Sequence, residues 1–277
     1  MALTEAEVLT IEEKAREVRA SIIRMLVAAK SGHTAGPLGM TDIFSTLYFH
    51  TLVHDPKNSD WEGRDRVILS NGHIVPVRYA TMAHAGYFPV EEAETTLRKL
   101  GSRFQGHPER EKLPGMETTS GPLGSGVSQA AGMAYALRMD GKKNRIYCLT
   151  SDGEHQEGNT WEGIMFAGKY RLANLTQIID RNFIQIEGNT EDIMPLEPLA
   201  DKYRAFNWHV IEIDGHNIRQ IHEAIEQAKA VADMPTLILA NTIPGKGVKE
   251  IEGDYKWHGK PPTPEEGERF IKEILSV

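Results

Sequence analysis

Asp152 and Asn182 stand 30 residues apart in the sequence, and each comes just after an apolar run typical of a buried strand (145–150 and 175–180). Neighbouring parallel strands end at the same edge of a sheet, so a carboxylate and an amide oxygen would meet there. Oxygen ligands of this kind suit Mg²⁺, and also Ca²⁺ or Mn²⁺, with room for water and phosphate. Asp152 alone could equally cap the following helix, but capping does not account for Asn182.

Five of the eleven histidines have a glycine neighbour. They lie in Gly32-His33, Gly72-His73, Gly106-His107, Gly215-His216 and His258-Gly259. Glycine lets the backbone approach a ligand closely, and imidazole exchanges a proton near neutral pH. A single histidine of this kind is more often a solvated loop residue. Five together favour a binding or catalytic site.

A glycine-rich turn, Gly121-Pro122-Leu123-Gly124-Ser125-Gly126, leads into an apolar segment with helical periodicity. Such turns expose backbone N–H groups at a helix N-terminus and suit a phosphate. The run lacks the preceding strand and the glycine spacing of a dinucleotide-binding motif. Taken alone, it could be a simple loop-to-helix turn.

The remaining pattern predicts the elements that would position these residues. Helices are expected over 5–29, 41–52, 75–85, 90–99, 127–139, 159–171, 198–205, 217–232 and 265–275. Strands are expected over 66–69, 145–150, 175–180, 208–213 and 236–241, and irregular segments over 31–39 and 101–125. Alternating strands and helices predict an α/β fold, a doubly wound and mostly parallel sheet with helices on both faces.

Composition excludes several classes of protein. The 277 residues carry 31 Lys plus Arg against 39 Asp plus Glu, a net charge of −8, which argues against a nucleic-acid binder. Cys148 is the only cysteine, so an intrachain disulfide and a cysteine-based zinc cluster are excluded. The first residues lack the apolar core of a signal peptide, and no apolar run reaches 18 residues. We therefore expect a cytoplasmic protein with no membrane segment.

Several motifs in order resemble the diphosphate-binding half of transketolase, a thiamine-diphosphate enzyme. They are Ser31-Gly32-His33, Pro37-Leu38-Gly39, Ser70-Asn71-Gly72-His73, Gly106-His107-Pro108-Glu109, Thr119 to Gly124, Asp152-Gly153-Glu154 with Asn182, and His258-Gly259. The resemblance covers about residues 10–259. Thr34-Ala35 replace the usual Pro-Gly, and Ser151 replaces the first glycine of Gly-Asp-Gly. These changes alter the loop backbone and leave the polar side chains in place.

The resemblance implies a role for each matching residue. A divalent metal would be bound by Asp152, Asn182 and the backbone carbonyl of Ile184. The diphosphate would be held by His73, Gly121, Gly153 and His258, and the cofactor rings by Leu123, Ile186 and Ile243. The substrate would face His33, His107 and His258. Glu157 and Glu162 match carboxylates at the subunit interface, although acids at a helix N-terminus are the simpler interpretation.

The resemblance also indicates what this chain lacks. The family needs a pyrimidine-binding domain whose glutamate activates the cofactor, and only about 35 residues follow the last predicted strand. We therefore predict a subunit of a split transketolase that moves a two-carbon ketol unit from a ketose phosphate to an aldose phosphate, as in the pentose phosphate pathway. It would bind thiamine diphosphate and Mg²⁺, and work with a C-terminal-half partner in an α2β2 heterotetramer. Residues 1–260 would form the cofactor domain, and 261–277 a polar tail with a short helix.

Two alternatives remain open. The α subunit of a 2-oxo acid dehydrogenase shares the metal motif but is not expected to carry the histidine set. A non-catalytic binding subunit could keep the fold, but it would not need the intact metal pair and histidines.

Overall fold

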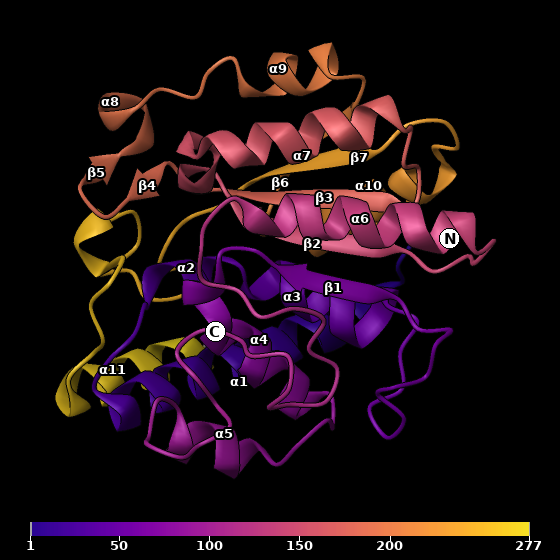
Figure 1. Ribbon diagram of the computed structural model, residues 1–277. Coiled ribbons are helices and arrows are strands. Elements are labelled where there is room, and N and C mark those ends of the chain that lie inside the picture. Colours follow the sequence, from indigo (N-terminus) through magenta and orange to yellow (C-terminus); the bar gives the residue numbers. More distant parts are fainter. Residues whose placement is uncertain (1, 277) are drawn as a thin grey trace.

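The computed structural model describes residues 2–276 and has a five-stranded parallel sheet at its centre (Figure 1). Its strands, in spatial order, are β1 (Arg66–Leu69), β2 (Ile146–Ser151), β3 (Leu175–Arg181), β7 (Thr236–Asn241) and β6 (His209–Asp214). Every neighbouring pair is parallel, and Ser151 pairs with Asp180 at the carboxyl ends of β2 and β3. The expected α/β architecture is confirmed, and the ends of β2 and β3 lie together as predicted.

Helices cover both faces of the sheet because successive strand residues point to opposite sides. Val67 and Leu69 join the core beneath one helix layer, whereas Ile68 joins the other core. The first layer contains α1 (Glu5–Ala29), α3 (Thr41–Thr46), α4 (Val75–His84) and α10 (Ile218–Ala230). The second contains α6 (Ser125–Met139), α7 (Gly158–Lys169) and α9 (Leu199–Ala205). In Figure 1, α6 and α7 run side by side across this second face.

Residues 31–52 differ from the sequence prediction. The expected loop contains a short helix, α2 (Ala35–Gly39), and the expected helix 41–52 is α3 followed by a π-helical turn (Leu47–Thr51). A side chain at Gly36 would overlap Ile74, so α2 lies very close to the start of α4. This close packing is long-range information that local periodicity does not contain.

Smaller elements also follow β3. Ile184–Gln185 (β4) and Gly188–Asn189 (β5) form a short antiparallel hairpin, and α8 (Thr190–Ile193) follows it. Three short 3-10 turns lie at Gly72–Ile74, Gly153–Gln156 and Tyr255–Trp257. Two of these turns contain residues for which the sequence predicts a site.

The segment between α5 (Val90–Thr96) and α6 is irregular, as predicted, although the helix expected over 90–99 ends earlier. Aromatic packing stabilises the segment, since the Phe104 ring lies 5.0 Å from that of Phe88 and 5.3 Å from that of Tyr79. A loop anchored in this way can hold His107 in place.

The C-terminal helix α11 (Pro264–Leu275) packs against α1. Phe270 and Ile274 are buried in the same core as α1, and a side chain at Gly267 would overlap Val27. The predicted short helix is therefore present, but it has a buried apolar face that the expected polar tail would not have. The division of the chain at residue 260 stays a prediction.

Within residues 2–276, no helix combines the length and apolar character required to cross a membrane.

Candidate functional site

A cavity of about 340 Å³ lies beyond the carboxyl ends of β2 and β3. Most of the predicted site residues line it, and they come from loops far apart in the sequence. They are His33, His73, His107, Gly121, Leu123, Gly153, Asn182, Ile184, Ile186 and His258. The fold therefore gathers at one place the residues that the sequence motifs singled out.

Two predicted site residues do not line this cavity. Asp152 is completely buried behind its wall. Ile243 is not among the residues that line the cavity, and 38% of its surface is exposed. Its N–H donates to His216 Nε2 at 2.7 Å. Ile186, in contrast, lines the cavity with 72% of its surface exposed, so it has apolar area free for packing against a ring.

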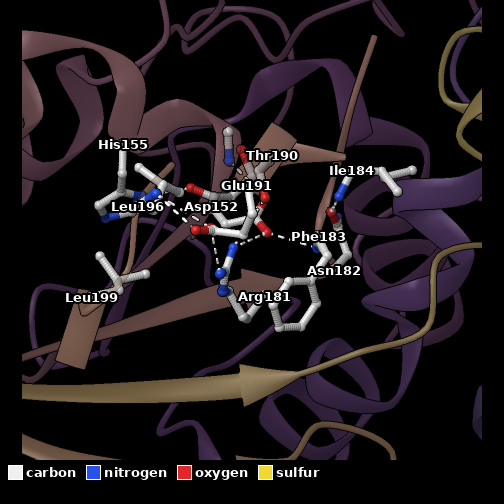
Figure 2. Close-up of polar contacts among 12 residues, drawn as sticks. Asp152, His155, Arg181, Asn182, Phe183, Ile184, Thr190, Glu191, Leu196 and Leu199 are labelled. Carbon is white, nitrogen blue, oxygen red and sulfur yellow. Dashed lines mark hydrogen bonds and ion pairs between the residues drawn. The ribbon is translucent and has the colours of Figure 1, made fainter. Parts of the chain in front are cut away.

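Asp152 receives hydrogen bonds on both carboxylate oxygens (Figure 2). Gly153 N–H donates to Oδ1 at 2.6 Å, and Phe183 N–H donates to Oδ2 at 2.7 Å. Burial raises the pKa of this carboxyl to about 6, while the nearby Arg181 acts in the opposite direction. One lone pair of Oδ1 is left for a further ligand.

The donor set predicted for a metal consists entirely of oxygens. Asn182 Nδ2 donates to Asp180 at 2.7 Å, which leaves the amide oxygen as the ligand atom. That oxygen accepts one hydrogen bond, from Ile184 N–H at 3.0 Å, and keeps a second lone pair. The Ile184 carbonyl oxygen lies 3.9 Å from where a Cβ on Gly153 would stand. One carboxylate, one amide and one carbonyl oxygen fit a hard cation that keeps water and phosphate ligands. Among the described residues, no group of three or more His, Cys, Asp and Glu side chains could hold a metal.

Arg181 is a buried cation beside this set, and the sequence analysis assigned it no role (Figure 2). It pairs with Asp152, and its Nη2 lies 2.7 Å from Glu191 and 2.8 Å from Glu197. Its guanidinium also lies 3.9 Å from the centre of the Phe183 ring. Arg181 is the last residue of β3, next to Asn182, and this charge directly after the apolar run 175–180 is the sequence signal for a role near the site.

Three histidine rings meet in the cavity. The ring centres lie 4.8 Å apart for His33 and His73, and 5.2 Å apart from each of these to His258. Burial lowers the pKa of His33 to about 4, with smaller contributions from His258 and Arg98. Burial also lowers the pKa values of His73 and His258. All three are therefore neutral at pH 7, and each has one donor and one acceptor nitrogen.

His107 lies beside this cluster and is more exposed. A Cβ on Gly72 would stand 3.2 Å from His107 Cδ2. The absence of a side chain at Gly72 therefore leaves space for the His107 ring. Burial and the charge of Arg98 lower the pKa of His107. His107 is thus a neutral, solvent-exposed group that lines the cavity.

Some buried polar atoms around the cavity lack a hydrogen-bond partner. They are His33 Nδ1 and both side-chain amide atoms of Asn71, whose side chain is completely buried. Unpartnered buried polar groups are costly, and they are often completed by a ligand. Asn71 belongs to the motif Ser70-Asn71-Gly72-His73, but the family resemblance implies no role for it.

The glycine-rich turn differs from the sequence prediction in one respect. Gly121 and Leu123 line the cavity, but Gly124 N–H donates to Glu154 and Gly126 N–H donates to Ser70. Gly124 N–H and Gly126 N–H are therefore bonded within the protein and are not free for a phosphate. The role of Gly121 in holding the diphosphate stays a prediction.

Glu157 and Glu162 lie at the start of α7, and both are exposed. Glu157 is the N-cap residue of α7 and makes no side-chain capping hydrogen bond, so only its charge can favour this helix N-terminus. Their role at a subunit interface stays a prediction.

Comparison with known proteins identifies the family. The family described as the thiamine diphosphate binding domain of transketolase matches residues 11–275. The chain belongs to the transketolase family. This transketolase chain is 42% identical to the 6-deoxy-6-sulfo-D-fructose transketolase subunit SqwG of Clostridium sp. (strain MSTE9), covering 95% of this chain and 96% of the relative. It is 37% identical to an apulose-4-phosphate transketolase subunit of Phocaeicola vulgatus, with 97% and 95% covered.

Solved structures agree with this assignment. The transketolase from Leishmania mexicana superposes with a TM-score of 0.90 at 33% identity, covering 96% of this chain and 41% of that chain. The transketolase from Campylobacter jejuni gives 0.89 at 37% identity, covering 97% and 42%. The chain thus spans less than half of these transketolases but almost all of the relatives named as subunits. The predictions of a transketolase subunit and of thiamine diphosphate as the cofactor are confirmed.

Proposed function

We propose that this chain is the cofactor-binding subunit of a two-component transketolase that transfers a two-carbon ketol unit from a ketose phosphate to an aldose phosphate. The observation that carries the proposal is the match in length. The alignments with relatives named transketolase subunits cover 95–97% of this chain and 95–96% of the relatives. The alignments with transketolases of known structure cover only 41–42% of those chains. A C-terminal-half subunit would supply the pyrimidine-binding part of the site.

In this proposal, Asp152, Asn182 and the Ile184 carbonyl hold Mg²⁺, while His73, Gly121, Gly153 and His258 hold the diphosphate. Thiamine diphosphate, when bound, supplies the nucleophilic carbon and the electron sink for breaking the bond next to the ketose carbonyl. Leu123, Ile186 and Ile243 pack against its rings. The exposed Ile186 and the oxygen-only donor set support these assignments.

His33, His107 and His258 act on the substrate in this proposal. A neutral imidazole accepts a proton from a sugar hydroxyl and later returns it. Burial favours the neutral form of His33, and its unpartnered Nδ1 is available for a hydroxyl. The ring centres of His33 and His258 lie 5.2 Å apart, so both histidines could contact the same bound substrate.

The assembly we propose is a cytoplasmic α2β2 heterotetramer. Glu157 and Glu162 would lie at its subunit interface, where their exposed carboxylates could connect two active sites. Closed twofold symmetry is the usual arrangement for such assemblies.

Reconstitution tests this proposal. The chain is mixed with its candidate C-terminal-half subunit, thiamine diphosphate and Mg²⁺. Two classes of donor are compared: ketose phosphates such as apulose 4-phosphate, and the sulfosugar 6-deoxy-6-sulfo-D-fructose. We expect aldose release and ketol transfer with a ketose phosphate. Turnover of 2-oxo acids instead would support the dehydrogenase alternative. Cofactor binding without turnover of any donor would support a binding subunit, and transfer from the sulfosugar alone would contradict the phosphate assignment.

A further inference from the structure

The buried carboxylate of Glu154 accepts hydrogen bonds from three separate segments. Oε1 accepts from the Ser70 hydroxyl and from Gly124 N–H, the latter at 2.6 Å. Oε2 accepts from Ser151 N–H at 3.2 Å. The residue is completely buried, and no Lys, Arg or His pairs with it among the described residues. The three donors must therefore provide the compensation for burying this group.

Each donor stands next to residues assigned to the cofactor. Ser70 directly follows β1, three residues before His73, and Gly124 follows Gly121 and Leu123. Ser151 directly precedes Asp152 and Gly153. One carboxylate thus connects the loop after β1, the turn before α6 and the loop after β2.

The same carboxylate completes the N-terminus of α6. Gly124 is the N-cap residue, has a φ of 83° and provides no side-chain cap. Gly126 N–H donates to Ser70 Oγ at 3.0 Å, and that hydroxyl in turn donates to Glu154. Two N–H groups at the start of α6 are thereby satisfied from outside the helix. A Cβ on Gly124 would stand 2.0 Å from Asn159 Oδ1, so the turn has little space to move.

We propose that Glu154 is a positioning residue of the cofactor site, which holds the three diphosphate-binding loops in register without contributing a contact of its own to the reaction. The proposal rests on the cofactor assignments made above. The hydrogen bonds that join Glu154 to three loops can be tested on the chain alone, without the cofactor.

The test uses Glu154→Gln, whose amide nitrogen would face one of the three donors. Asp65→Asn is the matched control, because Asp65 is a buried carboxylate that accepts from Arg145 N–H at 2.9 Å and from Val53 N–H at 3.1 Å. It directly precedes β1, at the amino ends of the strands, whereas the cavity lies beyond the carboxyl ends. Ser70→Ala is a second, milder variant that removes one donor to Glu154 and the acceptor for Gly126.

Two readouts are taken from the full chain and from the reconstituted pair. Amide hydrogen exchange over residues 121–128 should be faster in Glu154→Gln and in Ser70→Ala than in Asp65→Asn. Calorimetry with thiamine diphosphate and Mg²⁺ should show affinity lowered about 10- to 100-fold in Glu154→Gln, the range expected for groups that orient ligands, and within about twofold of wild type in Asp65→Asn. The kcat at saturating cofactor should stay close to wild type.

Unchanged exchange and unchanged affinity in Glu154→Gln would overturn the proposal. If that variant does not fold, Ser70→Ala decides between the outcomes by the same two readouts. A wild-type pair that binds no thiamine diphosphate would instead refute the proposed function, and hydrogen exchange would still test whether Glu154 connects the loops. Equal loss of affinity in Asp65→Asn would show that general destabilisation is the cause.

Discussion

Arg181 Nη1 lies 3.0 Å from Asp152 Oδ2, and both side chains are buried (Figure 2). The carboxylate assigned to the metal therefore already faces a permanent cation. Arg181 also pairs with Glu191 and Glu197, so it connects the segment after β5 to the proposed metal ligand. Arg181 opposes the rise in the Asp152 pKa that burial causes, and its bond to Oδ2 orients the carboxylate.

Replacing a metal ligand should affect cofactor binding first. In Asp152→Asn and in Asn182→Ala, the affinity for Mg²⁺ with thiamine diphosphate should fall about 100-fold or more, because the diphosphate charge is no longer neutralised in a partly dry site. Calorimetry on the reconstituted pair measures this. Unchanged affinity in both variants would refute the metal assignment.

The histidines should separate into two functional classes. His33→Ala and His107→Ala should lower kcat/KM for the ketose donor about 10²- to 10⁴-fold with nearly unchanged cofactor affinity, because their proposed partners are substrate hydroxyls. His73→Ala should weaken cofactor affinity first, and His258→Ala should do both. His209→Ala, at the start of β6, is the control. Wild-type donor kinetics in the first two variants would exclude their catalytic roles.

Stability should depend on pH through His33. Burial lowers its pKa to about 4 from the ordinary histidine value of 6.5, so between these values the unfolded chain binds more protons than the folded chain. The free energy of unfolding should therefore fall as the pH drops from 6.5 to 4, and the fall should be smaller in His33→Gln. Urea unfolding at about pH 7.5, 5.5 and 4.5 measures it. Parallel curves for wild type and variant would indicate a solvated histidine.

The isolated chain should be folded but inactive. In the proposed function the C-terminal-half subunit provides the pyrimidine-binding part of the site, so turnover should appear only after that subunit is added. A coupled assay of each chain alone and of the mixture tests this expectation. Activity of the single purified chain would contradict the split-enzyme proposal.

The C-terminal helix should contribute to stability. Phe270 is buried, and its ring lies 5.5 Å from that of Trp257, next to His258. Phe270→Ala should lower the free energy of unfolding by about 3–5 kcal/mol, the range for removing a buried aromatic ring. Chemical denaturation measures the change. A loss below about 1 kcal/mol would mean that residues 261–277 behave as a separate tail.

The sequence alone determined the strands, the loops that carry the site and the family. Apolar runs such as 175–180 and glycine-histidine pairs such as Gly72-His73 are local patterns, and local patterns can be recognised without knowing the fold. The parallel sheet then followed, because alternating strands and helices have few compact arrangements.

Only the tertiary structure decided which charges and donors face one another. The pairing of Arg181 with Asp152 joins residues 29 positions apart, and the bond from Ser70 to Glu154 joins residues 84 apart. No periodicity encodes such contacts, since they depend on how loops from different strands come together. The occupied N-terminus of α6 shows the consequence: the turn has the sequence of an anion site, but Glu154, from a distant loop, takes the N–H of Gly124.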